Sequence, residues 1–130
     1  MEMKPSFDLE TVYVQLLDGP AVARVEVSPE FWQEIGNRPE LHDGRLVGVF
    51  PYTEDWKTWE MHPAGDELVY LLSGEVNLIL DDGGSGKRIH MGAGTACLVP
   101  RGTWHRAEVR KPGRALHITR GKGTAHRPLE

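Results

Sequence analysis

Residues 59–67 read Trp-Glu-Met-His-Pro-Ala-Gly-Asp-Glu, a stretch that contains three side chains suited to binding a metal: Glu60, His62 and Glu67. Glu60 and His62 are two positions apart, so on a β-strand both side chains leave the same face. The Pro-Ala-Gly-Asp segment that follows has the composition of a turn, after which Glu67 begins another strand. The stretch therefore predicts two neighbouring strands that present two carboxylates and one imidazole together.

A second stretch supplies another imidazole. Residues 100–103 read Pro-Arg-Gly-Thr, which is typical of a tight turn, and His105 follows at the start of a strand expected over 104–109. A third element can thus bring His105 to the same place as His62 and Glu67.

The spacing of these residues resembles the two sequence motifs of the cupin superfamily. The first motif, over residues 54–74, has the order Gly, His, His, Glu, Gly, and its positions are occupied here by Glu54, Glu60, His62, Glu67 and Gly74. The second motif, over residues 94–109, has the order Gly, Pro, Gly, His, Asn, and its positions are occupied by Gly94, Pro100, Gly102, His105 and Val109. The sequence departs from the pattern at Glu54, Glu60 and Val109.

The resemblance implies a single cupin domain over residues 1–130 and one divalent transition metal ion. By position, His62, Glu67 and His105 look like metal ligands, and Glu60 takes the place of the first histidine. Two imidazoles and two carboxylates would suit Mn, Fe, Ni or Zn. Glu60 is either a fourth ligand, a residue behind the ligands, or a catalytic base. The alternative without a metal is an ordinary ion pair of Glu60 or Glu67 with Arg101 or Arg106.

The rest of the chain predicts an all-β fold. Short β-rich segments recur between Gly, Pro and Asp residues, which is typical of a barrel or sandwich; they cover 11–16, 21–27, 45–52, 59–62, 67–72, 75–80, 95–99, 104–109 and 115–119. Residues 81–86 and Pro112-Gly113 are expected to be hairpin connections. Residues 28–36 predict one short helical insert with Ser28 as N-cap. With the resemblance, this indicates a cupin-type double-stranded β-helix, or jelly-roll barrel.

Composition restricts the function. The 130 residues and 39% hydrophobic content fit one core, and a net charge of −4 argues against a nucleic-acid partner. The single Cys97 cannot form an internal disulfide, and no apolar segment approaches the roughly 20 residues that span a membrane, so we expect a cytoplasmic protein. Leu68, Tyr70 and Leu72 are apolar on the outward face of their strand, which favours a homodimer, with cover by the first two strands as the alternative.

Several further side chains are candidates for a ligand pocket. Trp56, Tyr70 and Met91 are possible lining residues, whereas Trp59, Met61 and Trp104 should point away because they alternate with Glu60, His62 and His105. His117 is expected to be either a hydrogen-bonded core histidine or a residue that enters the barrel as a proton shuttle or a polar contact to a substrate. Two functions follow: a metal-dependent enzyme on a small polar metabolite, of oxygenase, isomerase or decarboxylase type, or a non-catalytic cupin that binds or senses a small molecule.

Overall fold

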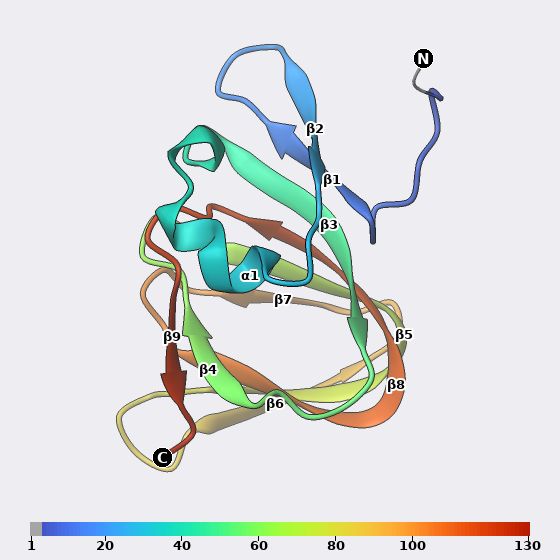
Figure 1. Ribbon diagram of the computed structural model, residues 1–130. Helices are drawn as coiled ribbons and strands as arrows, with labels where there is room; N and C mark the ends of the chain where they lie inside the picture. Colours follow the sequence, from blue (N-terminus) through green and yellow to red (C-terminus); the bar gives the residue numbers. More distant parts are fainter. Residues whose placement is uncertain (1–3) are drawn as a thin grey trace.

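Two long bent strands organise the fold, which a computed structural model describes for residues 4–130 (Figure 1). The strands within this range are β1 (Val12–Leu16), β2 (Val22–Glu26), β3 (Arg45–Tyr52), β4 (Thr58–Met61), β5 (Glu67–Leu80), β6 (Lys87–Gly92), β7 (Ala96–Val99), β8 (His105–Thr119) and β9 (Ala125–Pro128). A short helix, α1 (Phe31–Glu34), continues into two 3-10 turns, η1 (Ile35–Asn37) and η2 (Pro39–Leu41). The predicted all-β jelly-roll barrel with one short helical insert is confirmed.

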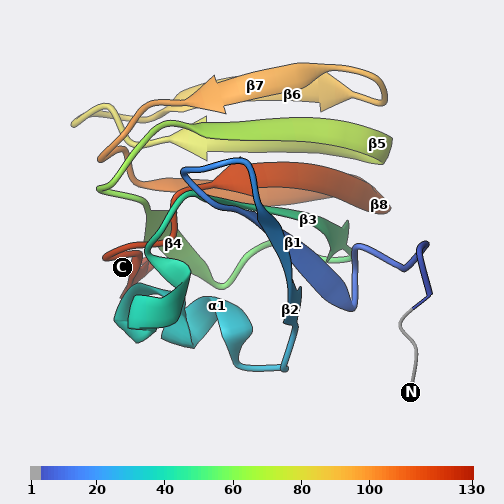
Figure 2. The same cartoon turned by 90° about the horizontal axis from the view of Figure 1, so that it is seen from above.

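The strands form one curled antiparallel sheet. Its hydrogen-bonded order is β2-β1-β3-β8-β4-β9, and β5 adds to it by pairing with β6, β7 and β8. Figure 2 shows β5, β6 and β7 on one side of the barrel and α1, β1 and β2 on the opposite side. Because β8 pairs with β3, β4 and β5, it connects the two sides of the barrel.

β5 and β8 are each one long bent strand, whereas the sequence analysis predicted two shorter strands in each place. The two strands shift register between Leu71 and Val76, and Gly74 has a positive φ of 86° at this bend. Gly113 lies against it so closely that a Cβ atom would come within 1.9 Å of the Ser73 carbonyl oxygen. The prediction of a hairpin at Pro112-Gly113 was wrong, since both residues lie within β8. Glycine is needed there to let the backbones approach.

The helical insert is shorter than the predicted 28–36 segment. Its N-cap is Glu30 and not Ser28, and no side chain caps the helix, although the amide of Phe31 donates to the Ser28 carbonyl oxygen. The insert is held by packing instead: Phe31 and Ile35 are fully buried in a cluster with Tyr13 and Leu46. This packing places Trp32, the residue after Phe31 in the helix, where it lines a cavity together with Phe50 on β3.

Part of the outer face stays apolar and exposed. Leu98 on β7 is 67% exposed, and Leu72 and Tyr70 on β5 are 41% and 37% exposed. The first two strands do not cover this face, because they lie on the other side of the barrel (Figure 2). No helix in the described part of the chain is long and apolar enough to span a membrane.

Candidate metal centre

The fold brings together the four residues that the sequence singled out. Glu60 on β4, His62 just after β4, Glu67 at the start of β5 and His105 at the start of β8 are all buried, and one potential ligand atom from each lies within 4.8 Å of the others. The register explains part of this, since Glu60 pairs directly with His105 across β4 and β8. His62 Nε2 is 3.1 Å from Glu60 Oε1 and 3.3 Å from Glu67 Oε2.

Each histidine of the cluster is oriented by a partner behind it. The Nδ1 atom of His105 lies 3.0 Å from the Thr103 carbonyl oxygen, which only accepts hydrogen bonds, so Nδ1 carries the proton and donates. Nε2 of a neutral His105 then has a free lone pair directed at the cluster. His62 is held in the same way by a 2.8 Å hydrogen bond between its Nδ1 and the hydroxyl of Thr124. Such outer partners are typical of histidines that bind metals.

Glu67 is anchored on one side and free on the other. Its Oε2 atom accepts a 2.6 Å hydrogen bond from the Thr119 hydroxyl and a 3.1 Å hydrogen bond from His117 Nδ1. The Nε2 atom of His117 is in turn 2.8 Å from the Tyr52 hydroxyl. Burial raises the pKa of Tyr52 well above its usual value, and the charges of Glu67 and Glu60 raise it further, so the hydroxyl stays protonated and can donate. The second oxygen, Oε1, points toward His105 Nε2 at 3.2 Å.

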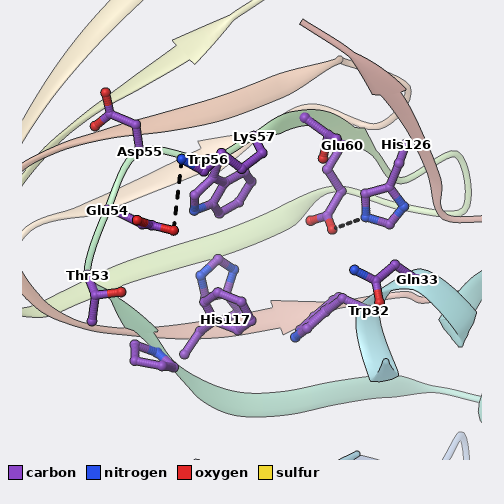
Figure 3. A pocket seen from close by; sticks show the side chains of 13 residues that line it. Trp32, Gln33, Thr53, Glu54, Asp55, Trp56, Lys57, Glu60, His117 and His126 are labelled. Atoms are coloured by element: carbon purple, nitrogen blue, oxygen red, sulfur yellow. Dashed lines mark hydrogen bonds and ion pairs between the residues drawn. The ribbon is translucent and has the colours of Figure 1, made fainter. Parts of the chain in front are cut away.

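Glu60 is anchored by a residue that the sequence analysis did not single out. Its Oε2 atom accepts a 2.9 Å hydrogen bond from His126 Nε2 (Figure 3). His126 lies on β9, which pairs with β4 in a register that places Glu60 opposite His126. Because β9 (Ala-His-Arg-Pro) is short and lacks alternating apolar residues, its sequence carries no strand signal. The same C-terminal segment supplies Thr124 behind His62.

The charged groups of the cluster shift one another's pKa values and keep one another ionised. Burial alone would raise the pKa of Glu60, but the hydrogen bond from His126 and the close contact with His62 outweigh it and lower that pKa to about 2. Burial alone would lower the pKa of His62, but the charge of Glu67 and the contacts with Glu60 and Glu67 raise that pKa to about 10. Both carboxylates are therefore ionised at neutral pH, and the cluster attracts positive charge.

Three buried atoms in the cluster have no hydrogen-bond partner. They are His62 Nε2, Glu67 Oε1 and His105 Nε2, and they converge from three elements. Leaving buried polar atoms unpartnered is costly, so such convergence needs an explanation. A divalent cation would satisfy all three, and two imidazoles with two carboxylates are a suitable donor set for a transition metal. The alternative pairing with arginine does not occur: Arg106 pairs with Glu108, and Arg101 forms no ion pair among the described residues.

A cavity of about 340 Å³ opens next to the cluster. Its lining includes Glu60 and His126, while His62, Glu67 and His105 lie outside the lining. Figure 3 shows Trp32 from α1, Trp56 from the β3–β4 loop and His117 from β8 around this space. The remaining lining residues are Gln33, Phe50, Pro51, Thr53, Glu54, Asp55, Lys57 and Thr58. The cluster is thus approached from the pocket through Glu60.

The structure shows which of the other residues considered for the pocket lining contribute to it. Trp56 lines the pocket as expected, but Tyr70 is exposed on the outer face and Met91 is buried in the core, so both predictions of a lining role were wrong. Trp59 and Trp104 point outward as predicted; the Arg127 guanidinium lies 5.4 and 4.6 Å from their ring centres. His117 is buried and hydrogen-bonded, as one of its two predictions had it, and it also lines the pocket; the contact to a substrate stays a prediction.

A buried cluster of histidines and carboxylates inside a jelly-roll barrel is the arrangement found in one large class of small β-barrel proteins. The chain belongs to the cupin family, because the cupin domain profile matches residues 38–119, more than half of its length. Trp32 and His126 lie outside the matched region. None of the curated proteins compared with this sequence matches it significantly.

Solved structures with the same fold include several cupins. A cupin-2 domain protein from Shewanella frigidimarina is 18% identical with a TM-score of 0.50, over 57% of this chain and 68% of that one. A mutant of oxalate decarboxylase from Bacillus subtilis is 20% identical with a TM-score of 0.54, over 65% of this chain but only 24% of that one. Hydroquinone 1,2-dioxygenase, solved with Cd²⁺ and 4-hydroxybenzonitrile, is 25% identical with a TM-score of 0.50, over 58% of this chain and 57% of that one.

Proposed function

We propose that this cupin is a metal-dependent enzyme that acts on a small molecule bound in the pocket beside Glu60. The observation that carries the proposal is the convergence of three unpartnered buried ligand atoms, from His62, Glu67 and His105, directly behind Glu60, which lines an open cavity. We infer that these three residues hold one divalent ion of Mn, Fe, Ni or Zn, with Glu60 as the fourth ligand or as a base. When bound, the ion would supply Lewis-acid or redox chemistry toward a substrate oxygen.

The side chains around the cluster have distinct roles in this proposal. Glu60 is the carboxylate of the cluster that lines the pocket, so its position is the one from which a proton could be taken from a bound substrate. His126 holds the Glu60 carboxylate through Oε2 and is also exposed to the pocket, where it can pass a proton onward. Tyr52 and His117 hold Glu67 at the closed side, away from solvent.

Elemental analysis of protein purified without an affinity tag or chelator tests the metal. We expect close to one equivalent of a single transition metal, and a loss of most of it in His105→Ala. The matched control is His90→Ala, which removes an exposed imidazole on β6 that pairs with Glu75 far along β5 from the cluster. A protein that contains no metal, and takes up none of these four ions after dialysis, would contradict the proposal.

The second candidate function is a cupin that binds a small molecule without catalysis. It is favoured by the burial of His62, Glu67 and His105 behind Glu60, which would leave an ion closed off if Glu60 is a permanent ligand. Water-proton relaxation of the Mn²⁺-loaded protein separates the two functions. Rapidly exchanging water at the ion supports an enzyme, and its absence supports the binding protein.

We also infer a homodimer through the exposed apolar residues Tyr70, Leu72 and Leu98, since burying this face would remove it from water. Light scattering coupled to gel filtration should give twice the chain mass, and Leu98→Glu should give a monomer. A monomeric parent protein would contradict the inference. The cytoplasmic location and the absence of a nucleic-acid partner remain predictions.

A further inference from the structure

We propose that the pocket beside Glu60 selects an uncharged single-ring aromatic compound that carries a hydroxyl group, which we call a phenol-class ligand. The inference rests on the proposed function, because the hydroxyl would be received at the inner end of the pocket, where Glu60 and His126 lie. It goes beyond that function by naming a chemical class, and by excluding small dicarboxylates and other anions.

The walls of the pocket are aromatic. Trp32, Phe50 and Trp56 all line it, and each is partly exposed to the space. The ring centres of Trp32 and Phe50 are 5.9 Å apart, and those of Phe50 and Trp56 are 6.5 Å apart, in edge-to-face arrangements. The indole N–H of Trp32 already donates to the Tyr13 hydroxyl at 3.1 Å, so this ring offers its apolar surface and not a hydrogen bond. Such walls favour a planar ring as ligand.

The charges at the pocket argue against an anion. Glu54, Asp55 and Glu60 contribute three carboxylates to the lining, and Lys57 contributes its single ammonium group. That group is 79% exposed and lies 4.0 Å from Glu54, so it is already partly neutralised. No arginine lines the pocket, although arginine is the side chain best suited to bind a carboxylate in two places.

The proposed ligand set strengthens this argument. A divalent ion held by Glu60 and Glu67 has its charge balanced by two carboxylates, so the centre is neutral overall. A set with histidine in place of Glu60 would keep one positive charge for an anionic substrate. Asp55 adds fixed negative charge, since its carboxylate is held by a 2.7 Å hydrogen bond from the Val109 amide. An anion would therefore enter without a compensating cation, whereas a neutral ring would not be penalised.

The cavity is large enough for a ligand with one substituted ring. Its volume of about 340 Å³ lies at the lower end of the range for small-molecule sites, roughly 300 to 1,000 Å³. Glu60, which is hydrogen-bonded to His126, is buried at the inner end of the lining, and the largely exposed Glu54 and Lys57 lie at the mouth. A ring with a hydroxyl at its inner edge satisfies both the aromatic walls and the inner polar groups.

The test is calorimetric titration of the full-length, metal-loaded protein with four probes: phenol, catechol, benzoate and oxalate. We expect catechol or phenol to bind at least tenfold more tightly than benzoate and oxalate. Trp56→Leu should weaken phenol binding by about two- to tenfold, the range expected for loss of one aromatic contact. Phe7→Leu removes an aromatic ring outside the pocket lining and should leave phenol binding unchanged. Trp32→Phe serves as a second variant if Trp56→Leu does not fold.

The outcomes separate this inference from the proposed function. Tighter binding of benzoate or oxalate than of phenol by a protein that contains metal overturns the inference and leaves the metal proposal intact. The same holds if none of the four probes binds. If the protein takes up no metal but binds phenol in a manner that depends on Trp56, the aromatic pocket is supported and the proposed function fails. Glu54→Gln should improve benzoate binding a few-fold without changing phenol binding, and an unchanged affinity for benzoate would contradict the charge argument.

Discussion

Glu67 and Glu60 are the two carboxylates of the same cluster, yet their surroundings differ. Glu67 is 1% exposed, and hydrogen bonds from Thr119 and His117, both on the long central strand β8, fix its Oε2 atom. Glu60 lines the pocket, and its Oε2 is held by one residue, His126, on the short edge strand β9. The difference teaches that equal chemical type does not mean equal role: under the proposed function, Glu67 would hold the ion and Glu60 would meet the ligand.

The largest effects on metal affinity are expected from substitutions of His62, Glu67 and His105. These residues lie outside the pocket lining, and we call them the closed side of the cluster. Glu67→Gln, His62→Ala and His105→Ala should each raise the Kd for the metal about 100-fold or more. Structural zinc binding is worth about 10 to 16 kcal/mol, so one of four ligands contributes roughly 3 kcal/mol, which is about 100-fold in Kd. Competition with a fluorescent chelator measures the change. Full metal occupancy in any of the three variants would defeat the ligand assignment for that residue.

Glu60 should behave differently from Glu67. We expect Glu60→Gln to raise the Kd for the metal at least tenfold less than Glu67→Gln does. Glu60 lines the pocket, where water can take the place of its oxygen at the ion, whereas Glu67 is buried away from the pocket. Turnover, once a substrate is found, should fall much more than metal content if Glu60 is a base. Glu60→His restores an imidazole and is the matched control, since it should keep the metal but lose the base. Equal metal loss in Glu60→Gln and Glu67→Gln would break the comparison.

Much of the closed side could be predicted from the sequence. Most of the residues around Glu60 and the pocket, which form the open side, could not. The turn residues around Gly65 and Gly102 and the two-residue step from Glu60 to His62 are local signals that fix His62, Glu67 and His105. Thr124, His126 and Trp32 reach the site only through tertiary packing, from a strand and a helix with weak sequence signals. The bend that joins 67–72 to 75–80 was missed for a related reason, because Gly74 is typical of a turn as well as of a bend within a strand.

Substitution of the residues that hydrogen-bond to the two carboxylates should give a smaller difference in metal affinity. Thr119→Val removes a buried hydrogen bond to Glu67 with little change in shape, and it should weaken metal binding by roughly 10- to 100-fold. His126→Gln acts on Glu60. Because the His126 side chain is 25% exposed, this substitution should weaken metal binding less than tenfold. Chelator competition and circular dichroism on both variants check this order. A larger loss of metal in His126→Gln than in Thr119→Val would show that β9 and not β8 secures the ion.

The smallest expected effect is on the pH dependence of stability. In the metal-free protein the pKa of His62 is raised to about 10, so its stabilising charge is fully present below about pH 6.5 and is lost as the pH rises toward 10. The affinity for the metal instead increases as the pH rises, because the imidazoles must lose protons to bind an ion. The difference in Tm between loaded and metal-free protein should therefore grow by a few degrees, on the order of 5 °C, between pH 6.5 and 9.

The two carboxylates contribute unequally to that pH effect. Burial lowers the pKa of His62, and the charge of Glu67 is the largest influence that raises it, ahead of the contact with Glu60. In the metal-free variants, Glu67→Gln should therefore flatten the decline of Tm with rising pH more than Glu60→Gln does. Thermal unfolding of both variants, followed by tryptophan fluorescence at pH 6.5, 7.5 and 9, measures the slopes. Equal slopes would mean that His62 is held equally by both carboxylates, and the division into a closed and an open side would then rest on the pocket alone.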